Sequence, residues 1–308
     1  MKNLSTSRFV LIACGLIGAI TVGVLFAARA GKSVSPVTEE YGNHLVAKTT
    51  EVLGPDVANP QMRFTDSRLA CASCHIGAGQ EPGNLSLVAA ISKYPRISPR
   101  SGGNETIQDR INGCMMRSMN GRALAENSPE MLSMVSYLRF LAEQDAATGA
   151  GAKKAHEPPA FKTPNRKADF TNGELVFGKR CAACHGKDGE GLAASTNPTE
   201  GFVFPPLWGK NSFNDGAGLH RVLTAARFIK AKMPLGKADL SDDDAFDLSA
   251  WVNSRPRPEM AGLEKDYPDL KKKPVDTGYG PYADPFPMVQ HRFGPFQPIE
   301  AYYKNLLK

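Results

Sequence analysis

The sequence predicts an all-α protein built from two similar helical domains. The five-residue pattern Cys-x-x-Cys-His occurs twice, at residues 71–75 and 181–185, and each copy is followed by a segment whose apolar residues recur at helical spacing. A chain of 308 residues with 42% hydrophobic content can bury two small cores. We therefore expect one plan repeated twice along the chain.

The helices that close the two domains have clear start signals. Ser128 is followed by Pro129, a residue favoured at the first helical position, and residues 131–141 then carry an apolar face. Ser241 precedes three aspartates in a pattern that resembles a capping box. Residues 173–177 indicate a helix that leads into the second motif. Each domain should therefore contain a helix, the motif, a loop-rich middle and a closing amphipathic helix.

The repeated pattern is the attachment signature of c-type haem. Two thiols about one helical turn apart bond the two vinyl groups of a porphyrin, and the adjacent imidazole binds the iron. A zinc site or a disulfide pair is the alternative interpretation, but two copies 110 residues apart behind an export signal favour a dihaem cytochrome c. We expect two covalently bound haem c groups. The residues expected to hold them are Cys71, Cys74, His75, Cys181, Cys184 and His185.

Cys114 is the one cysteine of the exported part that belongs to neither motif. It follows His75 by 39 residues, roughly where a cytochrome fold supplies the second axial ligand of its haem. A thiolate ligand lowers the reduction potential of the iron, and we expect Cys114 to be that ligand. Two alternatives stay open. Cys114 is a small buried residue, or a neighbouring methionine binds the iron in an ordinary electron-transfer haem; the candidates are Met115, Met116 and Met119.

For the second haem, the candidate ligand is Met233, which lies 48 residues after His185. The following Pro234 fixes the backbone and suits a thioether held on a stiff loop. Lys232 is a competing ligand only when it is deprotonated. The alternative interpretation of Met233 is a core methionine.

The N-terminal segment, residues 1–32, is expected to be a signal peptide or a membrane anchor, because residues 9–28 are apolar and uncharged. Export places the protein in the periplasm, either soluble or tethered by this helix. The expected order is a first cytochrome c domain at 33–145, a linker at 146–167, a second domain at 168–258 and a C-terminal tail at 259–308. The tail is rich in Pro, Gly and aromatic residues, so we expect an ordered, irregular strap without helices.

Arginines gather around Cys114 in the sequence. If this segment is helical, Arg110, Cys114 and Ser118 lie on one face, and arginine forks are suited to binding oxyanions. The alternatives are a solvated basic face and a surface that steers an acidic redox partner. Export and the lack of a recognisable nucleic-acid module argue against nucleic acid as a partner. The arginines are Arg96, Arg100, Arg110, Arg117 and Arg122.

Residues 109–121, Asp-Arg-Ile-Asn-Gly-Cys-Met-Met-Arg-Ser-Met-Asn-Gly, resemble the segment that carries the haem-ligating cysteine in the tetrathionate-forming dihaem thiosulfate dehydrogenases. Residues 273–284 and 290–296 are similar to the C-terminal stretch of that family, and Lys232-Met233 resembles its second-haem ligand loop. The resemblance covers essentially the whole exported chain. The cysteine segment and the tail are its specific parts.

The resemblance implies oxidation of two thiosulfates to tetrathionate at a haem with His75 and Cys114 as axial ligands. A second haem, held by His185 and Met233, would pass electrons to an acceptor such as a small cytochrome, and Lys232 would replace the methionine in one redox state. Residues at positions where the family binds sulfonate oxygens are Arg100, Arg110 and Ser118, and Gln80 corresponds to a family glutamine.

Two other functions remain open from the sequence. A non-catalytic dihaem electron carrier would have methionine ligands at both haems and no need for Cys114. A sulfur-oxidation cytochrome with a cysteine-ligated haem would act on the cysteine of a carrier protein rather than on free thiosulfate.

Overall fold

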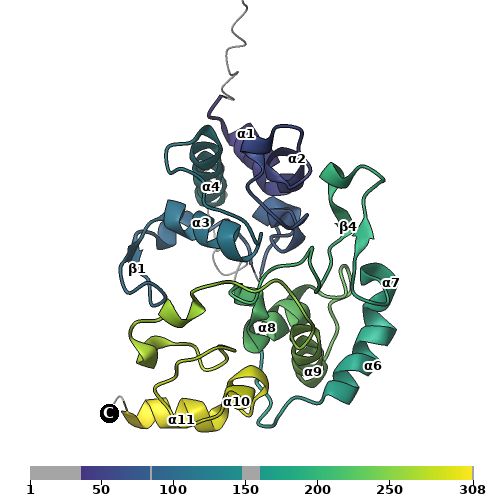
Figure 1. Ribbon diagram of the computed structural model, residues 1–308, viewed down its shortest axis with the longest axis vertical. Helices are drawn as coiled ribbons and strands as arrows, with labels where there is room; N and C mark the ends of the chain where they lie inside the picture. The colour runs from purple at the N-terminus through teal and green to yellow at the C-terminus, as the bar shows by residue number, and fades with distance from the viewer. Residues whose placement is uncertain (1–35, 84, 148–159, 307–308) are drawn as a thin grey trace, which may run out of the picture. The chain divides into compact units, whose positions relative to one another are not determined.

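The structure is a computed structural model that describes residues 36–83, 85–147 and 160–306. The expected export or anchor segment therefore lies outside the described residues. Within them, no helix is long and apolar enough to cross a membrane. Helices make up most of the regular structure, and the strands form two short antiparallel pairs (Figure 1).

The first half of the described chain holds four helices and one strand pair. Helix α1 packs against the long helix α4, and α3 also contacts α4. The strands β1 and β2 pair antiparallel just before α3. The bounds are α1 Glu39–Ala47, α2 Thr49–Leu53, β1 Arg96–Ile97, β2 Asn104–Glu105, α3 Ile107–Arg117 and α4 Pro129–Ala147.

A glycine allows α1 and α4 to approach closely. A Cβ atom on Gly42 would lie 2.0 Å from the carbonyl oxygen of Ser133, so a larger residue would force the two helices apart. The Ser128 hydroxyl accepts from the backbone N–H of Met131 at 3.2 Å, which confirms the predicted start of α4. The core beneath this crossing contains Leu45, Met131 and other buried apolar residues.

The second half repeats this arrangement. Helix α6 packs against α9, and α8 covers another side of α9. A Cβ atom on Gly173 of α6 would lie 2.4 Å from the carbonyl oxygen of Asp247 in α9, so a glycine again marks the crossing. The bounds are α6 Phe170–Arg180, α7 Ala182–His185, β3 Leu192–Ala193, β4 Phe202–Phe204, α8 Val222–Lys232 and α9 Asp242–Asn253.

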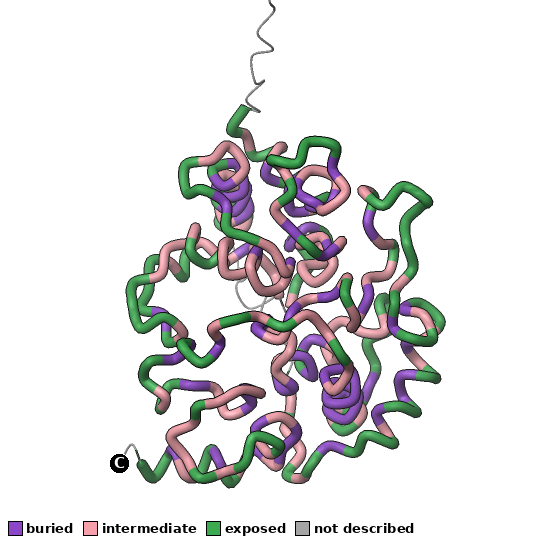
Figure 2. Tube along the Cα trace, in the orientation of Figure 1, coloured by how far each residue is buried: buried purple, intermediate pink, exposed green. Residues whose placement is uncertain are grey.

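Helix α9 starts at the predicted cap, where the Ser241 hydroxyl accepts from the backbone N–H of Asp244 at 3.0 Å. Its residues from Ala245 to Asn253 are all buried (Figure 2). A helix covered on several sides has no polar face to expose, which explains why its buried residues include Asp247 as well as Phe246.

The C-terminal tail is ordered, as expected, but the expectation that it contains no helix is wrong. It contains α10 (Met288–Phe293) and α11 (Gln297–Leu306), which follow two 3₁₀ turns at Leu263–Lys265 and Leu270–Lys272. Phe296 and Ile299 are fully buried against the second half, in a core that also contains Phe246. Each such buried side chain stabilises the fold by about 1.5–3 kcal/mol. Helices α10 and α11 are too short to be stable alone, so their packing against this core stabilises them.

Candidate functional site

The first Cys-x-x-Cys-His motif begins in a 3₁₀ turn, Cys71–Ser73, that contacts α1. The Thr49 hydroxyl accepts from the backbone N–H of Cys71 at 3.0 Å, which fixes the turn. Nδ1 of His75 lies 2.6 Å from the carbonyl oxygen of Leu85. Because a carbonyl only accepts, Nδ1 carries the proton, and Nε2 is left with a free lone pair.

The second motif repeats this geometry. His185 is the last residue of α7, and its Nδ1 lies 2.8 Å from the carbonyl oxygen of Pro205. In the described part of the chain, no protein group hydrogen-bonds Nε2 of either motif histidine. Two thiols beside an imidazole with an unpaired Nε2 are the donor set that haem c requires. Both motifs therefore fit haem c.

Cys114 lies near the end of α3, in the neighbourhood of the first motif. Helix α3 begins with a capping box, in which the Thr106 hydroxyl accepts from the N–H of Asp109 and the Asp109 carboxylate accepts from the N–H of Thr106. Burial raises the pKa of Cys71 to about 11 and that of Cys74 to about 12, and the nearby Cys114 adds to both increases. The Cys114 sulfur is therefore near enough to both attachment thiols to influence their pKa values.

The competing methionines have other environments. Met115 and Met119 are 1% and 3% exposed and pack into the core of the first half. Met116 is partly exposed, and its carbonyl oxygen accepts from the side-chain amide of Asn214 at 2.9 Å. Met115 and Met119 thus belong to the core of the first half, whereas Cys114 is partly exposed.

Arg110 lies one helical turn before Cys114, as the spacing predicted. Cys114 is the largest of several causes that raise the pKa of Arg110, which indicates that the two side chains are close. Among the described residues, none forms a hydrogen bond or an ion pair with the guanidinium of Arg110. An unpaired guanidinium beside a thiol is suited to hold a sulfur oxyanion.

Arg100 is held differently. Its Nη1 lies 2.9 Å from Oδ2 of Asp266 and also donates to the carbonyl oxygen of Gly216 at 3.3 Å. Arg117 shares both partners, because its Nη2 lies 2.8 Å from Oδ1 of Asp266 and its Nη1 donates to Gly216 at 3.2 Å. Tyr279 donates its phenol hydrogen to Asp266 at 2.7 Å. These five residues are called the Asp266 cluster below.

Two other predicted site residues have less direct connections. Ser118 is the C-cap of α3, and its backbone N–H donates to the carbonyl oxygen of Cys114. It therefore continues the helix turn that carries the cysteine. Gln80 donates its side-chain amide to the phenol oxygen of Tyr137 at 3.2 Å, so its observed contact is with α4 and not with the cysteine helix.

The predicted ligand loop of the second haem follows α8 directly. Met233 is the C-cap of this helix and donates its backbone N–H to the carbonyl oxygen of Ile229 at 2.9 Å. The ammonium of Lys232 donates to the carbonyl oxygen of Pro82, in the loop after the first motif. Lys232 therefore links the second half of the chain to the first.

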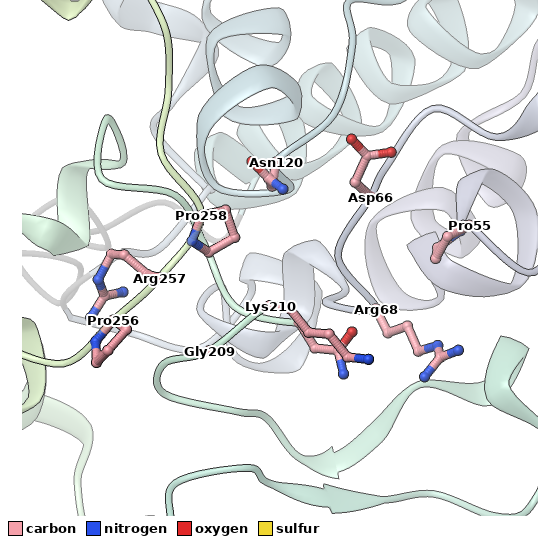
Figure 3. Close-up of a pocket in the computed structure, with 10 residues that line it drawn as sticks. Pro55, Asp66, Arg68, Asn120, Gly209, Lys210, Pro256, Arg257 and Pro258 are labelled. Carbon is pink, nitrogen blue, oxygen red and sulfur yellow. The ribbon is translucent and has the colours of Figure 1, made fainter.

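A separate hollow of about 580 Å³ opens on the surface (Figure 3). Asn120, Lys210 and Arg68 are among its lining residues, and Arg68 is paired with Asp56 at 2.6 Å. None of the predicted site residues lines this hollow. It is distinct from the region of Cys114 and Arg110.

Several contacts of the site had no signal in the sequence. The Asp266 cluster joins Arg100 and Arg117 to partners more than 90 positions away, and nothing in the local pattern indicates that pairing. The carbonyl groups of Leu85 and Pro205 were likewise not predicted as acceptors. A search for backbone acceptors in the loop after each motif histidine would have identified these two carbonyls as candidates.

These observations define the class of protein. Two helical domains, each with a first and last helix crossing at a glycine and a Cys-x-x-Cys-His motif between them, are cytochrome c domains that bind haem c. Residues 62–145 match the family model described as SoxA/TsdA, cytochrome c domain. Residues 168–252 match the model described as cytochrome C oxidase, cbb3-type, subunit III.

The chain belongs to the thiosulfate dehydrogenase family. It is 42% identical to the thiosulfate dehydrogenase of Allochromatium vinosum over 63% of this chain and 72% of that protein. It is also 42% identical to that of Psychrobacter arcticus, over 66% of this chain and 61% of that protein. Less than two thirds of the Psychrobacter protein is therefore matched.

A solved structure agrees with this placement. The thiosulfate dehydrogenase TsdBA from Marichromatium purpuratum, in its as-isolated form, superposes with a TM-score of 0.61 at 32% identity. The match covers 71% of this chain and 46% of that one.

Proposed function

We propose that this protein is a periplasmic dihaem cytochrome c that oxidises two thiosulfate ions to tetrathionate. The single observation that carries the proposal is the grouping of Cys114 with the first haem motif and the unpaired guanidinium of Arg110. The names of the similar proteins support the choice of thiosulfate. The two haem c groups are attached through the thiols of the two motifs.

His75 and Cys114 are the residues that would hold the iron of the first haem. The free Nε2 of His75 and the position of the Cys114 sulfur beside Cys71 and Cys74 support this pair. At the second haem, His185 and Met233 are the proposed ligands. Lys232 would have to leave the carbonyl of Pro82 before it replaced Met233.

Arg110 and Arg100 bind the sulfonate oxygens, and Ser118 adds a hydroxyl at the end of the same helix. Two thiosulfate dianions repel each other, so guanidinium groups are needed to bring their outer sulfur atoms together. Gln80 has the weakest support, because its amide is bonded to Tyr137.

The cysteine takes part covalently in this proposal. The thiolate of Cys114 and the outer sulfur of one thiosulfate form an S–S bond, and two electrons leave. The outer sulfur of a second thiosulfate then attacks that of the first, so tetrathionate departs and the Cys114 thiolate is restored without further oxidation. Bound haem would supply one-electron acceptors for these two electrons, and a small cytochrome is the proposed external acceptor.

The test replaces Cys114 by serine or by methionine and measures thiosulfate-dependent reduction of an artificial acceptor, with tetrathionate reduction assayed beside it. We expect both variants to lose at least about 100-fold in kcat/KM, since the nucleophile is gone. The thiolate signature should also disappear from the spectrum of the oxidised protein.

Met116→Leu is the matched control, because Met116 is also partly exposed and lies on the same helix. It should keep both activity and spectrum. Full turnover by Cys114→Met would rule out the covalent role. Turnover by the wild-type protein with a persulfurated carrier protein but not with free thiosulfate would favour a carrier-dependent sulfur-oxidation cytochrome.

A further inference from the structure

The C-terminal tail docks directly onto Arg100 through three different contacts. The carboxylate of Asp266 pairs with its guanidinium at 2.9 Å, and the backbone N–H of Tyr267 donates to its carbonyl oxygen at 2.7 Å. The ring of Tyr267 lies 5.4 Å from the guanidinium carbon of Arg100. Tyr267 also contributes to the raised pKa of Arg110, so the tail lies near both arginines.

The guanidinium groups of Arg100 and Arg117 differ in which of their nitrogens have partners. Arg117 donates from both Nη1 and Nη2, and its side chain is 13% exposed. Both of its terminal nitrogens are therefore engaged in holding the cluster together. Arg100 makes both of its contacts from Nη1 and is 28% exposed. In the described structure its Nε and Nη2 have no protein partner, and neither is sealed from solvent.

The Asp266 cluster has an excess positive charge that can attract an anion. One carboxylate, 10% exposed, faces two guanidinium groups, so one positive charge stays uncompensated. Tyr279 does not change this balance, because burial and its hydrogen bond to Asp266 raise the pKa of its phenol and keep it neutral. The Nη1 end of Arg100 is thus fixed by the protein, while its Nε and Nη2 edge keeps two donors in the geometry that an oxyanion prefers.

We propose that Asp266 is a positioning residue, through which the C-terminal tail holds Arg100 in the orientation that binds the oxyanion. This inference rests on the proposed function. The oxyanion site of the first cytochrome domain is then completed by a carboxylate from the tail, and not by that domain alone. Asp266 does not touch the substrate; it acts through Arg100.

The test compares Asp266→Asn with the wild-type holoprotein. Without the carboxylate charge, Arg100 loses its fixed partner and must be ordered at the moment of binding. We expect the KM for thiosulfate to rise about 10-fold, a change of roughly 1.4 kcal/mol, while kcat changes little. Inhibition by sulfate, an unreactive oxyanion, should weaken by a similar factor. Asp266→Glu, which keeps the charge, should restore most of the affinity.

Asp276→Asn is the matched control. Asp276 is also a buried carboxylate of the tail, and it also pairs with an arginine, because its Oδ1 lies 3.3 Å from Nη1 of Arg221. Among the described residues its hydrogen bonds and ion pair are with Arg221 and Leu223, and not with Arg100. Loss of its charge should lower the melting temperature without raising the KM. An equal rise of KM in both variants, or an unchanged KM in Asp266→Asn, would overturn the positioning role.

Tyr279→Phe keeps the inference testable if Asp266→Asn does not fold. It removes one hydrogen bond to the carboxylate and should raise the KM about threefold. The dissociation constant of thiosulfate, measured by titration calorimetry, separates this inference from the proposed function. If the wild-type protein binds thiosulfate but does not oxidise it, the proposed function fails, and the effect of Asp266→Asn on binding still decides the role of Asp266.

Discussion

Arg100, Arg110 and Arg117 lie close together in the sequence, but their partners give them different roles. Arg117 is engaged by Asp266 and Gly216, Arg100 is engaged on one side, and Arg110 has no hydrogen-bond or ion-pair partner among the described residues. A charged side chain that already has its partners stabilises the fold, whereas one without partners is available to a ligand. Arg110 should therefore carry the largest share of oxyanion binding.

We predict that Arg110→Gln raises the KM for thiosulfate by about 10-fold or more, because a charge-assisted pair contributes roughly 1.5–3 kcal/mol. Arg110→Lys should recover part of this loss, since lysine restores the charge but not the planar fork. Steady-state kinetics at several ionic strengths check both variants.

Arg122→Gln is the control for this prediction. Arg122 is exposed, and its guanidinium donates to two backbone carbonyls, those of Arg63 and Gln61. If its loss raises the KM as much as the loss of Arg110, a general basic surface attracts the anion and no specific site is needed.

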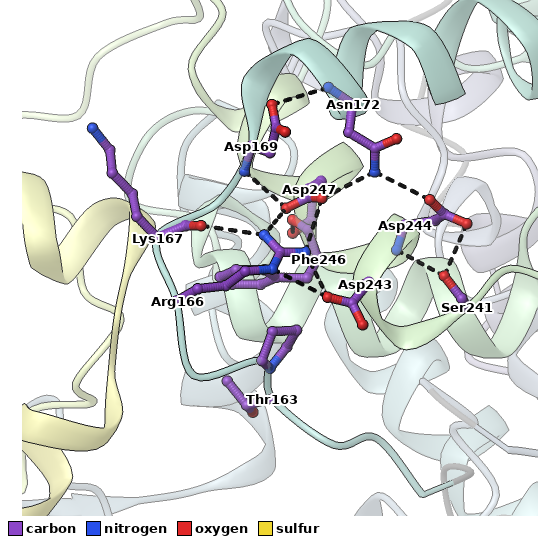
Figure 4. A network of polar contacts seen from close by, with 12 residues as sticks. Thr163, Arg166, Lys167, Asp169, Asn172, Ser241, Asp243, Asp244, Phe246 and Asp247 are labelled. Carbon is purple, nitrogen blue, oxygen red and sulfur yellow. Dashed lines mark hydrogen bonds and ion pairs between the residues drawn. The ribbon is translucent and has the colours of Figure 1, made fainter.

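At the scale of helices, α6 and α9 are held by a polar clamp beside their glycine crossing (Figure 4). Oδ1 of Asp247 lies 2.6 Å from Nη1 of Arg166, and the same carboxylate accepts from the backbone N–H of Asp169 and the amide of Asn172. Asp247 is only 2% exposed. A buried carboxylate with this many donors is stabilising only while all of its partners remain.

We predict that Asp247→Ala lowers the free energy of unfolding by about 3 kcal/mol, because the donors of Asp169 and Asn172 and the charge of Arg166 lose this buried acceptor. Urea denaturation measures the change. Because helix α9 contributes many of the buried residues of the second half, the midpoint of the unfolding transition should shift to a lower urea concentration.

Asp243→Ala is the matched variant, because Asp243 pairs with the same arginine at 2.6 Å but is 64% exposed. Its loss should cost about 0.5 kcal/mol, as is usual for exposed ion pairs. If both substitutions lowered the free energy of unfolding equally, burial of Asp247 would not explain the stability of the clamp.

At the scale of the whole molecule, the net charge of +6 disfavours a further positive charge on a buried side chain. His220 is an example. Burial, together with the charges of Arg257 and Arg292, lowers its pKa to about 4, although hydrogen bonds to the carbonyls of Asp215 and Asn253 oppose part of the shift. The folded protein therefore keeps His220 neutral.

The unfolded chain binds a proton at His220 with the ordinary pKa of about 6.5. Because the folded pKa is lower, the unfolded state binds more protons as the pH falls from about 6.5 to 4, and the folded state is destabilised by up to about 3 kcal/mol. We predict that His220→Gln removes this part of the pH dependence. Urea titrations of the holoprotein at pH 7, 6, 5 and 4 check it.

His44→Gln is the control, since His44 is exposed on α1. The slope of stability against pH between 6.5 and 4 should remain in this variant. If it remains in His220→Gln as well, another group causes the acid sensitivity.

Much of the fold followed from local chemistry. The starts of α4 and α9 were predicted from Ser128 and Ser241, because a cap needs only residues within one turn. Two helices of the tail were not predicted, since Met288–Phe293 and Gln297–Leu306 are stabilised by burial against distant residues rather than by strong local signals. The grouping of Arg110 with Cys114 followed from the helical period.

The sequence by itself determined the two Cys-x-x-Cys-His motifs, the repeated helical plan and the third sulfur at Cys114, because each depends on spacing within a short stretch. Only the tertiary structure decided which arginine is free and which is paired. Asp266 lies about 150 positions from its partner Arg117, and a contact at that separation depends on how two cores and a tail pack together. Local propensity contains no information about such packing.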